Sequence, residues 1–135
     1  DRVERCADQS LRIIDYKTGV VPSATMVENG ARNQLLVEAL IASEGGFDQV
    51  PAGVVSQIEY WQISGGRAQP GTIKPLHTNS FDSAKMRDSL ERLVTAYDDM
   101  STCYVSEPVP SLVPPFRPYK HLARCREWQI EADDD

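Results

Sequence analysis

Residues 11–19 read LRIIDYKTG, an apolar run that ends in an acid, an aromatic residue and a lysine before a turn. Because side chains alternate between the two faces of a strand, Asp15 and Lys17 share one face and Tyr16 points to the other. The two isoleucines upstream cover both faces, which predicts a strand buried on both sides. Charges at the end of such a strand are costly unless they are paired or bind something. The stretch therefore allows either a salt bridge that closes the strand or a functional site.

The bulk composition is that of a globular protein with one domain. The chain has 135 residues, of which 41% are hydrophobic and 25% charged, and these fractions are ordinary for soluble domains. It has no run of about 18 apolar residues, as a membrane span needs, and the opening DRVERC lacks the apolar core of a signal peptide. We expect a cytoplasmic protein without a membrane segment. Because the chain starts inside a strand-like run, we also expect a fragment of something longer.

The cysteines and the charge argue against several classes of site. Cys6, Cys103 and Cys125 are widely spaced and none lies in a CxxC pair, so no zinc site, iron–sulfur cluster or disulfide framework is expected. The net charge is −6, and the last five residues, EADDD, contribute −4 of it. This balance argues against a free-standing nucleic-acid binder. It still allows a domain that presents metal ligands while basic partners hold the DNA.

Hydrophobic periodicity and turn residues predict alternating strands and helices. Strands are expected at 1–6, 11–17 and 54–63, and helices from Ser23 or Thr25, at 31–44 and at 81–99. The segment with Pro70, Gly71 and Pro75 reads as a loop, 108–118 as a proline-rich extended segment and 119–128 as a last short helix. The order β-β-α-β-α predicts an α/β or α+β domain with helices packed on a small sheet.

The residue types near the first two strands suit a metal-dependent phosphodiesterase. Such an enzyme holds Mg²⁺ with carboxylates and fills the remaining positions with a backbone carbonyl or water. A cation nearby stabilises the charge that develops on the attacked phosphate. Asp15 and Lys17 supply one carboxylate and the cation, and Asp1 on the neighbouring strand is the candidate second carboxylate.

The register of the predicted hairpin tests this grouping. Residues directly opposite each other in a hairpin point to the same face. A two-residue turn at Asp8-Gln9 would pair Asp1 with Tyr16 and place Asp1 on the wrong face. An odd loop such as 8–10 would pair Asp1 with Lys17, so that Asp1, Asp15 and Lys17 share a face. A metal site therefore predicts an odd-length loop or a bulge, whereas a simple salt bridge has no such preference.

Several stretches resemble the RecB-type branch of the PD-(D/E)XK nucleases. The run DRVER, then IIDYKTG, then a helix that carries Gln-Leu is similar to the order of motifs in that family. The continuation IIDYKTGVVPS, the stretch YWQISGG and the stretch YKHLARCREW are similar to the C-terminal nuclease domain of bacterial AddB proteins. The resemblance extends over nearly the whole chain.

The resemblance implies a restriction-endonuclease-like fold, which is a mixed sheet flanked by helices. It implies that Asp1 and Asp15 bind Mg²⁺, or Mn²⁺ in its place, together with the backbone carbonyl of Tyr16. Lys17 would orient or activate the attacking water, and Gln34 would approach both the site and the DNA. The implied activity is exonucleolytic cleavage of single strands that an AddA-type helicase–nuclease partner unwinds at double-strand breaks.

The chain also departs from the family pattern. The upstream helix that carries a Glu or His ligand is missing, and no tyrosine follows Gln34, where the chain continues LLVEALIA. The four-cysteine pattern of some AddB relatives is missing too, so no iron–sulfur cluster is expected. We expect residues 1–107 to form a nuclease-like core without its first helix, and residues 108–135 to form a proline-rich extension with an acidic tail.

Three interpretations of function remain open at this point. The first is a nuclease domain, the second is a non-catalytic module of the same fold that docks a partner or guides a strand, and the third is a stand-alone RecB-like exonuclease. Arg2 is a candidate DNA contact or the partner of an ion pair with Glu4 or Asp15. Tyr60 and Trp61 point to opposite faces of a strand, so at least one is expected in the core.

Overall fold

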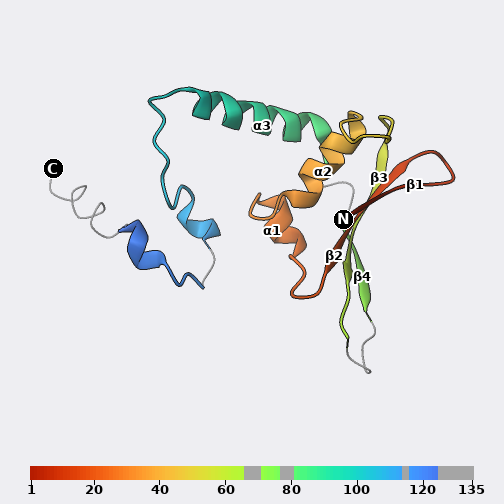
Figure 1. Ribbon diagram of the computed structural model, residues 1–135, viewed down its shortest axis with the longest axis horizontal. Coiled ribbons are helices and arrows are strands. Elements are labelled where there is room, and N and C mark those ends of the chain that lie inside the picture. Colours follow the sequence, from red (N-terminus) through yellow and green to blue (C-terminus); the bar gives the residue numbers. More distant parts are fainter. Residues whose placement is uncertain (66–70, 77–80, 114–115, 125–135) are drawn as a thin grey trace. The chain divides into compact units, whose positions relative to one another are not determined.

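The computed structural model describes residues 1–65, 71–76, 81–113 and 116–124 (Figure 1). Its elements are, in chain order, β1 (Arg2–Arg5), β2 (Leu11–Lys17), α1 (Ala24–Glu28), α2 (Gln34–Ser43), β3 (Val55–Gln62), β4 (Thr72–Leu76), α3 (Ser83–Asp98) and two 3-10 turns (Pro110–Leu112 and Lys120–Ala123). The chain divides into two compact units, Asp1–Val94 and Thr95–Asp135. The sheet and the helices that cover it belong to the first unit.

The four strands form one mixed sheet in the order β1-β2-β3-β4. β1 is antiparallel to β2, β2 is parallel to β3, and β3 is antiparallel to β4. A parallel pair needs a crossover connection, and α1 and α2 supply it on one side of the sheet (Figure 1). The predicted fold class, a mixed sheet flanked by helices, is confirmed.

The face of the sheet that α2 covers holds the apolar core, and we call it the helix face. Val3, Ile13, Ile58 and Leu76 are register partners in one row across all four strands. From α2, the buried side chains are Leu35, Leu36, Ala39, Leu40 and Ala42. Full burial of one such leucine or isoleucine stabilises the fold by about 2 kcal/mol. Ile13 and Ile14 are both 0% exposed, which confirms that β2 is buried on both faces.

A three-residue loop joins β1 to β2. Cys6 N donates to Ser10 O at 2.8 Å and Gln9 N donates to Cys6 O at 3.0 Å, so residues 7–9 form the loop. Gln9 has a φ of 68°, the left-handed conformation that ends a three-residue hairpin loop of this kind. Asp8 accepts from Ser10 Oγ at 2.6 Å and from Ser10 N at 3.0 Å. These hydrogen bonds hold the pKa of the Asp8 carboxyl below its usual value.

The loop has the odd length that a shared face for Asp1, Asp15 and Lys17 requires. The paired residues are Arg2 with Ile14, Val3 with Ile13, Glu4 with Arg12 and Arg5 with Leu11. The prediction of an odd-length loop is therefore confirmed. The predicted pairing is wrong, because each residue of β1 pairs with a residue two positions earlier in β2 than expected. Continuing the observed register by one residue sets Asp1 across from Asp15 and not across from Lys17.

β4 corrects the expectation that its segment is a loop. Thr72–Leu76 pairs antiparallel with β3, and Pro75 lies across from Glu59. Proline cannot donate to a neighbouring strand, but it is tolerated in an edge strand, where one side of the backbone makes no ladder. Among the described strands β4 is at the edge of the sheet, so Pro75 fits there.

α3 forms as its helical periodicity predicts, but none of its residues is fully buried. Phe81 and Met86 pack against the core as partly buried side chains, and Arg87 makes an ion pair with Glu44 at the end of α2. That pairing raises the pKa of Arg87. Within the described residues, no helix is long and apolar enough to span a bilayer.

In the second unit, the rings of Tyr97 and Tyr104 stack with centroids 4.9 Å apart. The segment predicted to be extended contains the 3-10 turn Pro110–Leu112. The 3-10 turn Lys120–Ala123 occupies the start of the predicted last helix. Arg124 follows it with a left-handed φ of 50°, and residues 125–128 of that prediction and the predicted acidic tail lie outside the described residues.

Candidate active site

A polar row follows the apolar row on the helix face. Asp15 on β2 is the register partner of Tyr60 on β3, and Tyr60 is the partner of Lys74 on β4. With Asp1 set across from Asp15, the four residues cross the sheet on one face. Tyr60 is 2% exposed, which confirms that one of the adjacent aromatic residues is in the core. Lys74 was missed because its segment reads as a loop.

The four residues expected at the site are joined in a line of contacts. Lys17 Nζ lies 2.5 Å from Asp15 Oδ2 and donates to Gln34 Oε1 at 3.4 Å. Gln34, the first residue of α2, donates from Nε2 to Asp1 Oδ2 at 2.9 Å. The end of β2, the start of α2 and the residue before β1 therefore meet at one point.

Asp15 is the most deeply buried charge of this cluster. It is 2% exposed, so most of its hydration is lost. Its Oδ2 atom makes an ion pair with Lys17 Nζ but accepts no directed hydrogen bond in the described structure. An ionised carboxylate has about four acceptor sites, and a buried polar atom without its full set of partners is often part of a functional site.

Glu38 joins the cluster although the sequence did not point to it. Gln34 Nε2 donates to Glu38 Oε1 at 3.1 Å as well as to Asp1. Residues four apart on a helix lie on the same side, one turn from each other. The spacing from Gln34 to Glu38 was visible in the sequence. What the sequence lacked was a sign that both acids share the amide of one glutamine.

Tyr60 lies within the electric field of the cluster. Burial raises the pKa of its hydroxyl, and the negative charges of Asp15 and then Glu38 raise it further, while Arg32 lowers it. Lys17 Nζ is 5.9 Å from the centroid of the Tyr60 ring, within the range of a cation–π contact. The ring of Tyr60 therefore borders the cluster on the β3 side.

The side chains present fit a divalent cation that is held by few protein ligands. The side-chain donors are the buried carboxylate of Asp15, whose Oδ2 contacts the Lys17 ammonium, and the exposed carboxylate of Asp1. Mg²⁺ commonly keeps several waters and is bound through one or two carboxylates. In the part of the chain that the structure describes, no three His, Cys, Asp or Glu side chains are grouped as a metal cage, so a cage made of protein ligands alone is not formed there.

The carbonyl of Tyr16 points toward the same place. Lys17 O accepts from Ile63 N at 2.8 Å, so it points toward β3. Successive carbonyls of a strand point to opposite sides, and the Tyr16 carbonyl therefore points toward the β1 side, where Asp1 lies. The Tyr16 side chain projects to the other face of the sheet and meets Trp61 edge to face, with centroids 5.8 Å apart.

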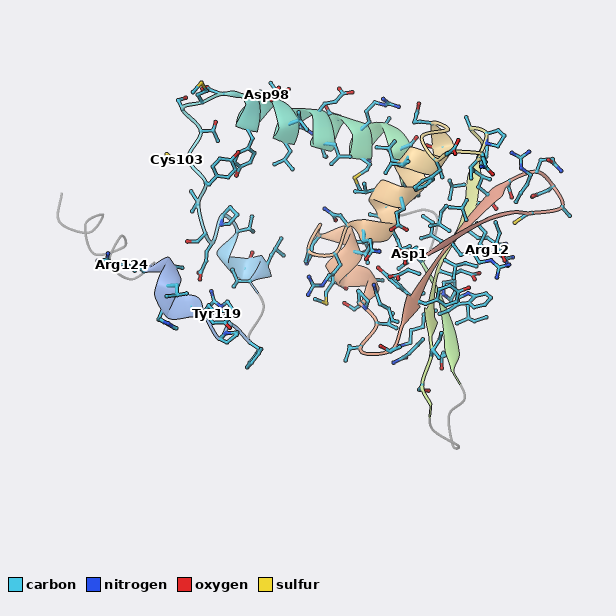
Figure 2. All side chains as sticks on the ribbon, in the orientation of Figure 1. Asp1, Arg12, Asp98, Cys103, Tyr119 and Arg124 are labelled. Atoms are coloured by element: carbon cyan, nitrogen blue, oxygen red, sulfur yellow. The ribbon has the colours of Figure 1, made fainter. Side chains whose placement is uncertain are left out.

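Arg2 lies on the face of the sheet opposite the cluster, which we call the outer face. Its register partner is Ile14, and its guanidinium lies 2.6 Å from Glu4. Of the two ion pairs considered for Arg2, the structure forms the one with Glu4. Arg12 also extends from the outer face, on the side of the sheet away from α2 (Figure 2).

Comparison with known proteins gives a family over nearly the whole chain. The model of the PD-(D/E)XK nuclease superfamily matches residues 1–126. Uncharacterized proteins of Rickettsia conorii and Rickettsia bellii are each 40% identical to the chain, over 47 and 48 residues. These matches cover 35% and 36% of the chain but 6% of each relative. No solved structure matches.

The family match and the geometry agree on the class of protein. Members of this superfamily are generally nucleases that use divalent metal ions, and the match includes the whole sheet, α2 and the cluster at the end of β2. The acid, the lysine two residues later and the acid from the preceding strand meet on one face. The chain belongs to the PD-(D/E)XK nuclease superfamily.

Proposed function

We propose that the chain is the nuclease domain of a cytoplasmic helicase–nuclease that processes DNA ends for recombinational repair, and that it cleaves single-stranded DNA with Mg²⁺. Asp1 and Asp15 would hold the metal with the Tyr16 carbonyl. Lys17 would position the attacking water, and Gln34 would tie the two sides of the site together. The observation that carries the proposal is the continuous line of contacts from Asp15 through Lys17 and Gln34 to Asp1.

The chemistry is hydrolysis of a phosphodiester. The oxygen of water forms a bond to phosphorus, the bond from phosphorus to one ester oxygen breaks, and the protons of water end on solvent and on the leaving oxygen. A bound divalent ion supplies Lewis acidity and lowers the pKa of coordinated water. The Lys17 ammonium, which is 29% exposed, can reach a phosphate oxygen from its place beside Asp15 and offset the negative charge that grows there.

The assignment to a repair complex rests on the resemblance of three stretches to AddB nuclease domains, IIDYKTGVVPS, YWQISGG and YKHLARCREW. On that basis the partner is an AddA-type motor subunit that delivers unwound strands. Arg2 would contact the DNA backbone, since its side chain is 56% exposed despite the contact with Glu4. Lys74 is an exposed cation in the polar row of the helix face, on the opposite face of the sheet from Arg2, and it would contact the DNA beside the cluster.

The test is cleavage of labelled single-stranded DNA by the protein at its natural length, with Mg²⁺, Mn²⁺ or a chelator. Wild type is expected to cut only with a divalent ion. Lys17→Ala is expected to lower the rate by about a thousandfold, within the range of a lost proton-transfer or charge-stabilising group. Lys85→Ala is the matched control, because Lys85 is an exposed lysine on α3 that pairs with Asp82 three residues away.

Three results would contradict the proposal. The first is cleavage that persists in the chelator, the second is cleavage that Lys17→Ala and Lys85→Ala leave equal, and the third is the absence of any cleavage. A folded protein that binds DNA or a motor subunit but never cuts would favour the non-catalytic module, and the Asp15–Lys17 contact would then be a structural ion pair.

A further inference from the structure

Two carboxylates and one ammonium surround the side-chain amide of Gln34. Its Nε2 donates to Asp1 Oδ2 at 2.9 Å and to Glu38 Oε1 at 3.1 Å. A primary amide nitrogen carries two N–H donors, so these two acceptors use both of them. Its Oε1 faces the other way and lies 3.4 Å from Lys17 Nζ.

These neighbours select a single orientation of the amide. Turning the amide over would bring its oxygen against two carboxylates and its NH₂ group against an ammonium, which is unfavourable at all three contacts. Asp1 alone could be satisfied by more than one rotamer of an exposed glutamine, whose rotamer freedom is high. Glu38 supplies the second anchor from the same helix, where it is half-buried.

We infer that Glu38 is a positioning residue of the site. It fixes the Gln34 amide so that Gln34 holds Asp1 with its nitrogen and Lys17 with its oxygen. The inference rests on the proposed nuclease function, and it gives Glu38 no direct contact with the metal or the DNA. What matters in this role is an acceptor oxygen at the distance that a glutamate side chain reaches.

The competing role for Glu38 is that of a direct metal ligand, and two conservative variants separate the roles. Glu38→Gln keeps the length and the acceptor oxygen but removes the charge. Glu38→Asp keeps the charge but shortens the side chain by one methylene. If Glu38 acts by positioning Gln34, the Glu38→Gln variant should be tolerated and Glu38→Asp should not, because the role depends on the length of the side chain. If Glu38 acts as a metal ligand or through its charge, Glu38→Gln should not be tolerated, because the role depends on the carboxylate.

The experiment measures the Mn²⁺ dissociation constant by electron paramagnetic resonance on the protein at its natural length, together with kcat and KM for single-stranded DNA. Glu38→Asp is expected to weaken Mn²⁺ binding about fivefold, as the loss of one hydrogen bond would. Glu38→Gln is expected to stay within about twofold of wild type, since its hydrogen bond is kept. Glu44→Gln is the matched control, because Glu44 follows the same helix but pairs with Arg87.

A double-mutant cycle then asks whether Glu38 acts through Gln34. In a Gln34→Ala protein, Glu38→Asp is expected to have no further effect on Mn²⁺ affinity. An equal loss in both backgrounds, or a larger loss for Glu38→Gln than for Glu38→Asp, would overturn the inference. Urea unfolding of each variant identifies any loss that comes from a damaged fold.

The inference and the proposed function fail separately. If wild type cuts DNA, Lys17→Ala does not and the two Glu38 variants bind Mn²⁺ equally, the nuclease function stands and the positioning role is wrong. If the Glu38 variants differ as expected but wild type cuts no DNA with any divalent ion, the positioning role stands and the nuclease function is wrong.

Discussion

The two faces of the sheet both carry charged side chains, but they satisfy those charges differently. On the outer face, Glu4 lies 2.6 Å from Arg2 and 3.4 Å from Arg12, and Arg12 also donates to Gln57. These side chains stay in partial contact with solvent. On the helix face, Asp15 is 2% exposed and its Oδ2 atom has one ion pair and no hydrogen bond.

The difference shows that ion pairs by themselves do not mark a site. An ion pair in contact with water contributes little to the free energy of unfolding, because water can replace either partner. A carboxylate that is desolvated and incompletely paired is held in place by the rest of the fold, and such groups are concentrated at functional sites. The helix face is therefore the face where removing a charge should change activity most.

Asp15→Asn should have the largest effect and should separate function from stability. The variant removes the desolvation cost of the Asp15 charge, and Lys17, which is 29% exposed, keeps water as a partner, so the free energy of unfolding is expected to change by no more than about 1 kcal/mol. Metal-dependent cleavage is expected to fall by about a thousandfold, since the proposed metal ligand is lost. Urea unfolding without divalent ions and DNA cleavage measure the two effects. A variant that loses both stability and activity would mean that Asp15 is a structural charge.

Tyr60→Phe should sharpen the comparison at high pH. Burial and the nearby acids raise the pKa of Tyr60 in the folded state, so the fold favours the neutral hydroxyl. That contribution is fully present below the unfolded pKa of about 10 and is lost as the pH rises through the folded pKa. Unfolding of wild type is therefore expected to become easier above about pH 10, and less so in Tyr60→Phe. Equal profiles of unfolding free energy for wild type and Tyr60→Phe from pH 8 to 11 would mean that the fold does not favour the neutral hydroxyl of Tyr60.

Glu4→Gln should have the smallest effect, and it is the outer-face counterpart of Asp15→Asn. Because Arg2 and Arg12 remain in contact with solvent, losing their shared partner is expected to change the free energy of unfolding by less than about 1 kcal/mol. The Mn²⁺ affinity is expected to change by less than about twofold. A loss as large as that of Asp15→Asn would erase the distinction between the two faces.

Local pattern was enough to predict much of the fold. The alternation of LRIIDYK predicted β2 and the burial of Ile13 and Ile14, and helical periodicity predicted α2 and α3. It could not predict β4, because Pro75 reads as a loop residue unless the strand is known to be at an edge. It could not show how little of α3 is buried, since periodicity describes the helix and not what packs on it.

Only those residues of the site that belong to a local sequence pattern could be predicted. Asp15 and Lys17 share a face by strand alternation, and the parity of the hairpin brought Asp1 to the same face. The exact partners were wrong by two positions, because either of two odd loops satisfied the pattern. Glu38 was missed because its role depends on the contact between Gln34 and Asp1, which are 33 residues apart.

The hairpin between β1 and β2 sets a rule for how this gene can change in length. A codon gained or lost inside the loop at residues 7–9 changes the length of the loop and leaves Asp1 across from Asp15. A codon gained or lost within β1, between Asp1 and the loop, would send Asp1 to the outer face, unless a bulge absorbs it, although no residue of the site is altered. Insertions and deletions in β1 should therefore survive selection for activity in pairs, whereas those inside the loop should survive singly.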